Sequence, residues 1–140
     1  MSERGLTPEY IKSALCGLVE VEHGNQGFEV TLAQMYHTGH SVVIMVRPES
    51  GGFLVHDNSA AAMLLTSMGF AVGKRLTDGI RSQIAAYGCE ISELRVWRLC
   101  ESVDDLAVAM SLVGCASRLV EQTIREAMAE AQQLKKDTEL

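Results

Sequence analysis

The chain has 140 residues, of which 47% are hydrophobic and 21% charged, and its formal net charge is −6. This length and composition predict one globular domain over residues 1–140 and exclude wholesale disorder. The acidic balance argues against nonspecific binding to duplex DNA, because such binding requires Lys and Arg side chains that neutralise phosphates.

No apolar run approaches the roughly 18 residues of a membrane-spanning helix, and the first ten residues contain no apolar signal core. We therefore expect no membrane segment. The cysteines form no C-x-x-C pair, so we expect neither a zinc site nor another cofactor. We interpret all four as free thiols, which favours the reducing cytoplasm as the location: Cys16, Cys89, Cys100 and Cys115.

The first predicted element is a helix over residues 8–17. Thr7 is a suitable N-cap, and Pro8 occupies the first helical position, where its missing N–H is not needed. Residues 19–22 and 28–32 then alternate with period two around a GNQG turn, which predicts a β-hairpin. The side chains expected on its inward face are Val19, Val21, Phe28, Val30 and Leu32.

A second hairpin is predicted in the middle of the chain. Residues 41–47 (SVVIMVR) and 53–55 (FLV) are apolar runs joined by a Gly-containing turn. The first run is apolar on both faces, which is typical of a central strand. Asp57, Asn58 and Ser59 are all good N-caps for a helix over residues 60–70.

A third helix is expected to have Thr77 or Asp78 as its N-cap and to place Ile80, Ile84 and Tyr87 on its core face. Residues 94–99 (LRVWRL) predict a further strand, with a short extended piece ahead of it at residues 90–91.

The last predicted element is a long helix over residues 102–136, with Ser102 and Asp105 in a capping box. Its apolar side chains follow a heptad seam. The half beyond about Val120 has no predicted element to cover it, so we expect self-association through this helix, most simply as a homodimer. The expected interface is Val113, Val120, Ile124, Ala127, Ala131 and Leu134.

Together these elements predict an α+β fold. An antiparallel sheet of about four to five strands is built from hairpins and covered by helices, the last of which is long.

Several sequence blocks in fixed order resemble a family of small bacterial and phage proteins that is catalogued only as a domain of unknown function. The blocks lie at residues 15–19 (LCGLV), 27–31 (GFEVT), 39–43 (GHSVV), 51–57 (GGFLVHD), 68–76 (MGFAVGKRL) and 85–90 (AAYGCE). The resemblance covers residues 8–125. It implies a compact α+β domain from a mobile-element setting and carries no catalytic residues.

One candidate for chemistry is the group of His37, His40 and Asp57. The histidines precede a central strand, and antiparallel pairing brings Asp57 near the same end, so a metal site or an acid–base pair is conceivable. The alternative is that Asp57 caps the following helix and that the histidines are solvated. A small enzyme or metal-binding protein centred on these residues therefore stays open as a second hypothesis.

A third hypothesis is an RNA-binding module that uses Arg95 and Arg98 around Trp97. The first hypothesis is a non-enzymatic protein-interaction module. The family resemblance implies that such a module is a phage or prophage accessory protein of the anti-defence (anti-CRISPR) type, which binds and inhibits a host complex. The expected partner-binding residues are Glu121, Glu126, Glu130, Arg95 and Arg98.

Overall fold

An antiparallel sheet of six strands organises the molecule, in the order β1-β2-β3-β4-β6-β5. The computed structural model describes residues 6–25 and 27–138. The strands are β1 (Glu20–Gly24), β2 (Gly27–Met35), β3 (Ser41–Glu49), β4 (Gly52–His56), β5 (Glu90–Ser92) and β6 (Arg95–Cys100). The helices are α1 (Pro8–Cys16), α2 (Ala60–Thr66), α3 (Lys74–Ile84) and α4 (Leu106–Thr138), with short 3-10 turns η1 (Ala85–Tyr87) and η2 (Val103–Asp105).

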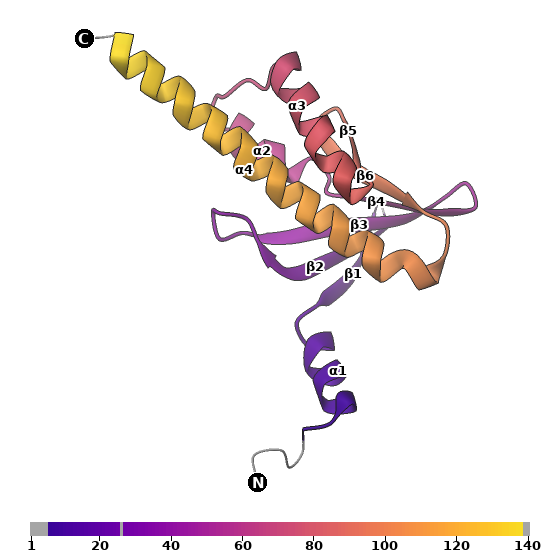
Figure 1. The fold of residues 1–140 in the computed structure, drawn as a ribbon. Helices are drawn as coiled ribbons and strands as arrows, with labels where there is room; N and C mark the ends of the chain where they lie inside the picture. Colours follow the sequence, from indigo (N-terminus) through magenta and orange to yellow (C-terminus); the bar gives the residue numbers. More distant parts are fainter. Residues whose placement is uncertain (1–5, 26, 139–140) are drawn as a thin grey trace.

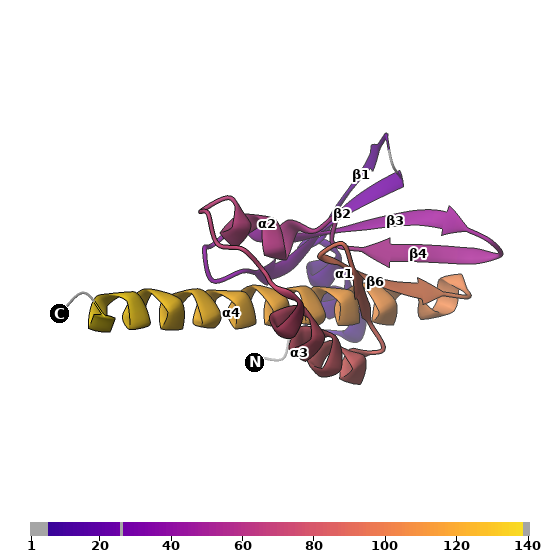
Figure 2. The ribbon, with the colours of Figure 1, turned by 90° about the horizontal axis from the view of Figure 1, so that it is seen from above.

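The expected α+β class is confirmed, although the sheet has one strand more than the upper estimate. Helix α4 crosses one face of the sheet diagonally and continues past its edge (Figure 1). Helices α2 and α3 pack against α4, and α3 also contacts β5. Figure 2 shows α3 and α4 on the same side of the sheet, and no helix of the described residues lies over the opposite side.

The hydrophobic core lies between α4 and the central strands. Antiparallel pairing places Val30 beside Ile44 and Val46 beside Val55 on the helix-covered face, and all four side chains are buried. Because successive residues of a strand point to opposite faces, Met45 and its neighbours on the same face point away from α4. The apolar character of β3 on both faces is thus explained by its central position.

The start of α3 differs from the prediction. The helix begins at Lys74, and its N-cap is Gly73, four positions before the expected cap Thr77. The Thr77 hydroxyl donates to the carbonyl oxygen of Gly73 at 3.0 Å, so this residue lies inside the first turn, where Ser and Thr side chains often bond back to the backbone. Ile80 and Ile84 are buried, as predicted.

The prediction for α4 is wrong at three interface residues. Val113, Val120 and Ile124 are fully buried in the core of their own chain, because α2 and α3 lie against the helix. Ala127 is half-buried, and only Ala131 and Leu134 of the expected interface are exposed. The part of α4 that extends past the body is therefore residues 129–138, all of which are exposed.

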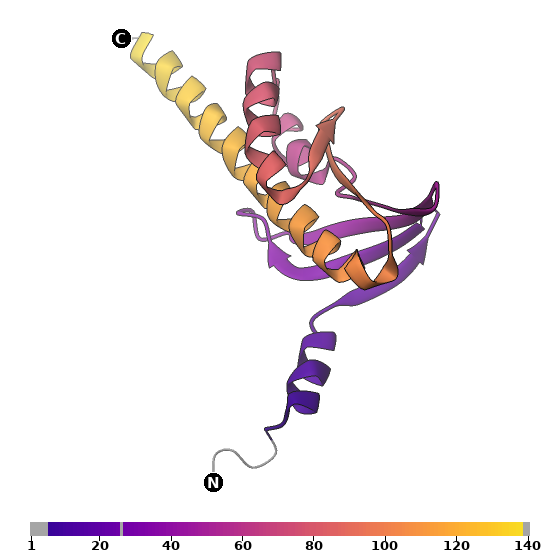
Figure 3. The ribbon, with the colours of Figure 1, turned by 45° about the vertical axis from the view of Figure 1, so that its right-hand side comes forward.

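The N-terminal region forms the predicted elements but is not buried. Helix α1 begins after Thr7, whose hydroxyl accepts the Tyr10 N–H at 3.2 Å. No residue of α1 is buried, and Figures 1 and 3 show the helix projecting away from the sheet. In the first hairpin, Val30 is buried as expected, Leu32 is half-buried, and Val19, Val21 and Phe28 are exposed. No helix of the described residues is both long and apolar enough to cross a membrane.

Candidate functional site

A buried carboxylate, Asp57, lies at the junction of β4 and α2 and is 1% exposed. Its Oδ1 accepts the backbone N–H groups of Val96 at 3.0 Å and of Ser59 at 2.9 Å. Burial raises the pKa of Asp57, whereas the hydrogen bonds from Ser117 and the backbone favour its charged form and lower the pKa. The bond to Ser59 forms an Asx-type turn ahead of α2, whose N-cap residue is Ser59 itself.

Asp57 also begins a chain of hydrogen bonds that reaches β2 through α4. The Ser117 hydroxyl donates to Asp57 Oδ2 at 2.7 Å. Because its single proton is used there, the Tyr36 hydroxyl, 2.7 Å from Ser117 Oγ, is the donor in that contact. Burial raises the pKa of Tyr36 to about 12, so the phenol keeps its proton at neutral pH. These hydrogen bonds connect the β4–α2 junction, α4 and the residue that follows β2. The hydroxyl protons of Ser117 and Tyr36 are both used within them and are not free for catalysis.

Glu121 forms a second buried contact between α4 and the loop that follows β2. Its side chain is buried, its Oε1 accepts the His37 backbone N–H at 2.7 Å, and its Oε2 lies 3.2 Å from Arg125 Nε. The i,i+4 pair with Arg125 is present. However, the prediction that Glu121 lies on an exposed partner-binding surface is wrong, because both of its oxygens bind groups of its own chain.

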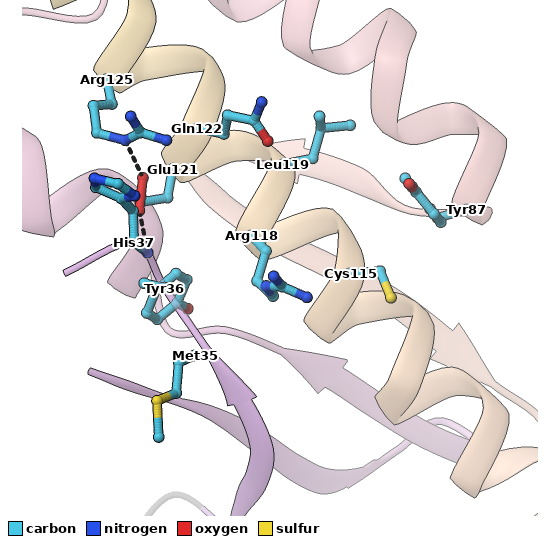
Figure 4. A pocket seen from close by; sticks show the side chains of 10 residues that line it. All are labelled: Met35, Tyr36, His37, Tyr87, Cys115, Arg118, Leu119, Glu121, Gln122 and Arg125. Carbon is cyan, nitrogen blue, oxygen red and sulfur yellow. Dashed lines mark hydrogen bonds and ion pairs between the residues drawn. The ribbon is translucent and has the colours of Figure 1, made fainter. Parts of the chain in front are cut away.

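These residues border a surface hollow of about 550 Å³. Figure 4 shows Tyr36 and His37 on one side of α4 and Tyr87 on the other, with side chains of α4 between them. The α4 side chains that line it are Cys115, Arg118, Leu119, Glu121, Gln122 and Arg125. A hollow that spreads over both sides of a helix does not exclude water from a substrate.

The hollow also lacks an assembled nucleophile. Cys115 is half-buried, and no hydrogen bond joins it to a histidine or a carboxylate in the part of the chain that the structure describes. A cysteine nucleophile needs such a base or a neighbouring positive charge that stabilises the thiolate. Arg118 lines the hollow and is exposed.

The structure does not bring His37, His40 and Asp57 together. Both histidines are exposed, and His40 Nδ1 lies 2.7 Å from the hydroxyl of Thr38. Asp57 instead points inward to Ser117. Within residues 6–25 and 27–138, no group of three or more His, Cys, Asp or Glu side chains is placed to hold a metal ion.

The two arginines of the RNA hypothesis lie on opposite faces of β6, because their positions differ by three, an odd number. Arg98 lies on the helix-covered side and donates to the carbonyl oxygen of Tyr87 at 2.7 Å. Arg95 lies on the side without helices. Glu126 and Glu130 are exposed on α4, as expected.

Sequence reasoning missed Tyr36 and Ser117 as a pair. One signal was available: Ser117 is a polar residue at a position of the apolar α4 seam. A polar residue at such a position needs a buried partner. That partner, Asp57, is sixty residues away in the sequence, so the spacing alone could not identify it.

A group of uncovered apolar side chains belongs to the first elements of the chain. Eight large apolar side chains there are between 38% and 67% exposed. We call this set the N-terminal surface: Leu6, Tyr10, Ile11, Leu15, Leu18, Val19, Val21 and Phe28. Groups of exposed apolar side chains are candidates for interaction sites in soluble proteins.

Comparisons with protein-family models, with curated proteins and with solved structures find no match for this chain.

Proposed function

We propose that this protein is a protein-interaction module that assembles as a homodimer through the N-terminal surface. The observation that carries the proposal is helix α1, nine residues long and without a buried residue. An isolated helix of this length is only marginally stable in water, so its apolar stripe needs a cover. A binding role also agrees with the buried acids, whose oxygens are used in hydrogen bonds that stabilise the fold.

The size of the N-terminal surface suits a second copy of the chain. Eight side chains, each roughly half exposed at ~100 Å², present on the order of 800 Å² of apolar area. A standard protein–protein interface buries about 800 Å² per partner. The N-terminal surface therefore supplies by itself the area that a stable dimer requires.

The shape of the N-terminal surface also favours a symmetric contact. It combines a projecting helix, α1, with an uncovered hairpin, β1 and β2 (Figure 3). In a twofold dimer, α1 of one copy covers the hairpin of the other, and the reverse contact follows by symmetry. One patch thus satisfies both halves of the interface.

The dimer would leave the acidic side of α4 open for another protein. Glu126 and Glu130 are exposed there, and a basic partner would be attracted to them. That this partner is a host defence complex, bound and inhibited by a phage or prophage accessory protein, follows only from the family resemblance and stays a prediction.

The dimer is tested by multi-angle light scattering at tens of micromolar. We expect a dimer for the natural chain and a monomer for Ile11→Asp combined with Leu15→Asp, because both charges would enter the apolar contact. Leu134→Asp is the matched control, since Leu134 is 67% exposed on the α4 extension. A natural chain that is monomeric, or a dimer that only Leu134→Asp dissociates, would refute the N-terminal interface.

A further inference from the structure

The uncovered face of the sheet contains a buried histidine. His56, at the end of β4, is 1% exposed although no helix of the described residues covers this face. Its neighbours in register are Met45 on β3 and Trp97 on β6. The cover over the imidazole therefore comes from long side chains of the sheet itself.

The hydrogen bonding of His56 defines which nitrogen carries the proton. Nδ1 accepts the backbone N–H of Asn58 at 2.9 Å, so the neutral ring carries its hydrogen on Nε2. Burial and the nearby positive charges of Arg95 and Arg47 lower the pKa of His56 to about 4, which keeps the ring neutral at pH 7. The Nε2–H group is buried and has no hydrogen-bond partner.

A second unpartnered donor lies on the same face. Arg47 pairs with Leu54 in the adjacent row of the sheet and is therefore a diagonal neighbour of His56. Its Nε is buried and makes no hydrogen bond, although Glu49 Oε2 lies 3.4 Å away as an ion pair without hydrogen-bond geometry. Buried donors without acceptors are rare in folded proteins, because each loses its hydration without compensation.

Arg95 completes a diagonal across three strands. It lies two residues before Trp97 on β6, on the opposite side of His56 from Arg47. The imidazole donor thus lies between two guanidinium groups, beside the apolar side chains of Leu54 and Leu99. This arrangement offers donors and positive charge to a carboxylate. Glu49 of the same chain lies 3.4 Å from Arg47 Nε, but neither buried donor has a hydrogen-bonded acceptor.

We propose that Arg47, His56 and Arg95 form a binding site for a carboxylate group. Its oxygens would accept from His56 Nε2–H and Arg47 Nε–H, and the two guanidinium groups would balance its charge. Because His56 is 1% exposed, a neighbouring side chain must move before the carboxylate can reach Nε2. Leu54, Leu99 and the indole of Trp97 accommodate an apolar body attached to it.

A carboxylate suits this face better than a nucleic acid or another polyanion. Glu29 is paired with Met45, and Glu49 ends β3 on the same face, so a multiply charged ligand would be repelled. The carboxylate can belong to a small organic acid or to an acidic side chain of a partner protein. The site lies apart from the N-terminal surface and does not depend on the dimer.

The proposal is tested by NMR of the intact, isotope-labelled protein during titration with sodium acetate at constant ionic strength. We expect saturable shifts of the His56 ring signals, with affinity about tenfold weaker in Arg47→Met, which loses a charge-assisted hydrogen bond, and in Arg95→Met, which loses a balancing positive charge. Arg118→Met, which changes an exposed arginine on α4, should bind acetate like the natural protein.

Internal controls distinguish lost binding from lost folding. The ring signals of exposed His40 should stay unchanged, and the backbone spectra of the variants should match the natural protein away from the substituted strand. Shifts that sodium chloride reproduces, or equal acetate affinity in Arg47→Met, would overturn the proposal. Tighter binding of inorganic phosphate than of acetate would overturn the assignment to carboxylates.

Discussion

Helices α1 and α4 are both amphipathic, yet they differ completely in burial. Helix α4 buries Val113, Val120 and Ile124 against the sheet and the neighbouring helices, whereas α1 buries no residue. Amphipathic spacing shows that a helix needs an apolar partner, but it does not identify the partner. For α4 the partner is the same chain, and for α1 we propose a second copy.

The largest expected effect comes from a charge in the buried part of α4. Ile124→Asp should reduce the free energy of unfolding by about 4 kcal/mol or more, because the carboxylate would lie in a fully apolar site. Urea denaturation, followed by far-UV circular dichroism, measures the change. Although Ile124 was expected at a dimer interface, its burial predicts that the substitution unfolds the protein.

Leu15→Asp on α1 is the matched control for this comparison. Measured at a dilution that keeps the protein monomeric, it should change the free energy of unfolding by no more than about 0.5 kcal/mol. A large loss of stability in the monomer would mean that α1 packs on the body of its own chain.

A smaller effect is expected from the buried hydrogen-bond chain. Ser117→Ala removes the donor to Asp57 and the acceptor for Tyr36, and should lower the free energy of unfolding by about 2 kcal/mol. The control is Ser111→Ala at an exposed position of the same helix, which should stay within about 0.5 kcal/mol of the natural protein. Equal losses in both variants would show that the chain of bonds does not stabilise the fold.

A further effect is a pH dependence that originates at His56. The folded protein holds this imidazole neutral, with its pKa lowered from 6.5 to about 4. The unfolded chain therefore binds a proton first as the pH falls, and the free energy of unfolding should decrease between about pH 6.5 and about pH 4. Burial lowers the pKa of His56 most, and the positive charges of Arg95 and Arg47 lower it further.

His56→Gln tests this pH dependence, because glutamine cannot titrate. Denaturation at a series of pH values should show a shallower decrease for the variant than for the natural protein. Asp57 acts in the opposite direction, since its raised pKa favours the folded state at low pH and this contribution is lost as the pH rises. Identical slopes for variant and natural protein would show that His56 is not held neutral.

The middle of the chain was predictable because local signals agree there. The apolar run of β3, the Gly-containing turn and the caps around Asp57 all indicate strand, turn, strand and helix. The start of α3 was missed since Gly73 caps it without a side chain, while Thr77 resembles a cap but lies one turn inside.

The candidate sites depend on contacts between distant parts of the chain and were less predictable. Whether Ile124 faces solvent or core depends on where α2 and α3 dock, which the spacing of one helix does not encode. The cluster of Arg47, His56 and Arg95 depends on the register of three strands. Each of these residues alone resembles an ordinary polar position of an exposed strand.

The account is tested most directly by amide hydrogen exchange of residues 8–16, measured over a range of protein concentrations. If a second copy covers α1, protection of these amides should rise with concentration, whereas protection around Val120 in α4 should stay constant. Exchange of residues 8–16 at the rate of an unfolded peptide at every concentration, or protection that does not depend on concentration, would contradict the account.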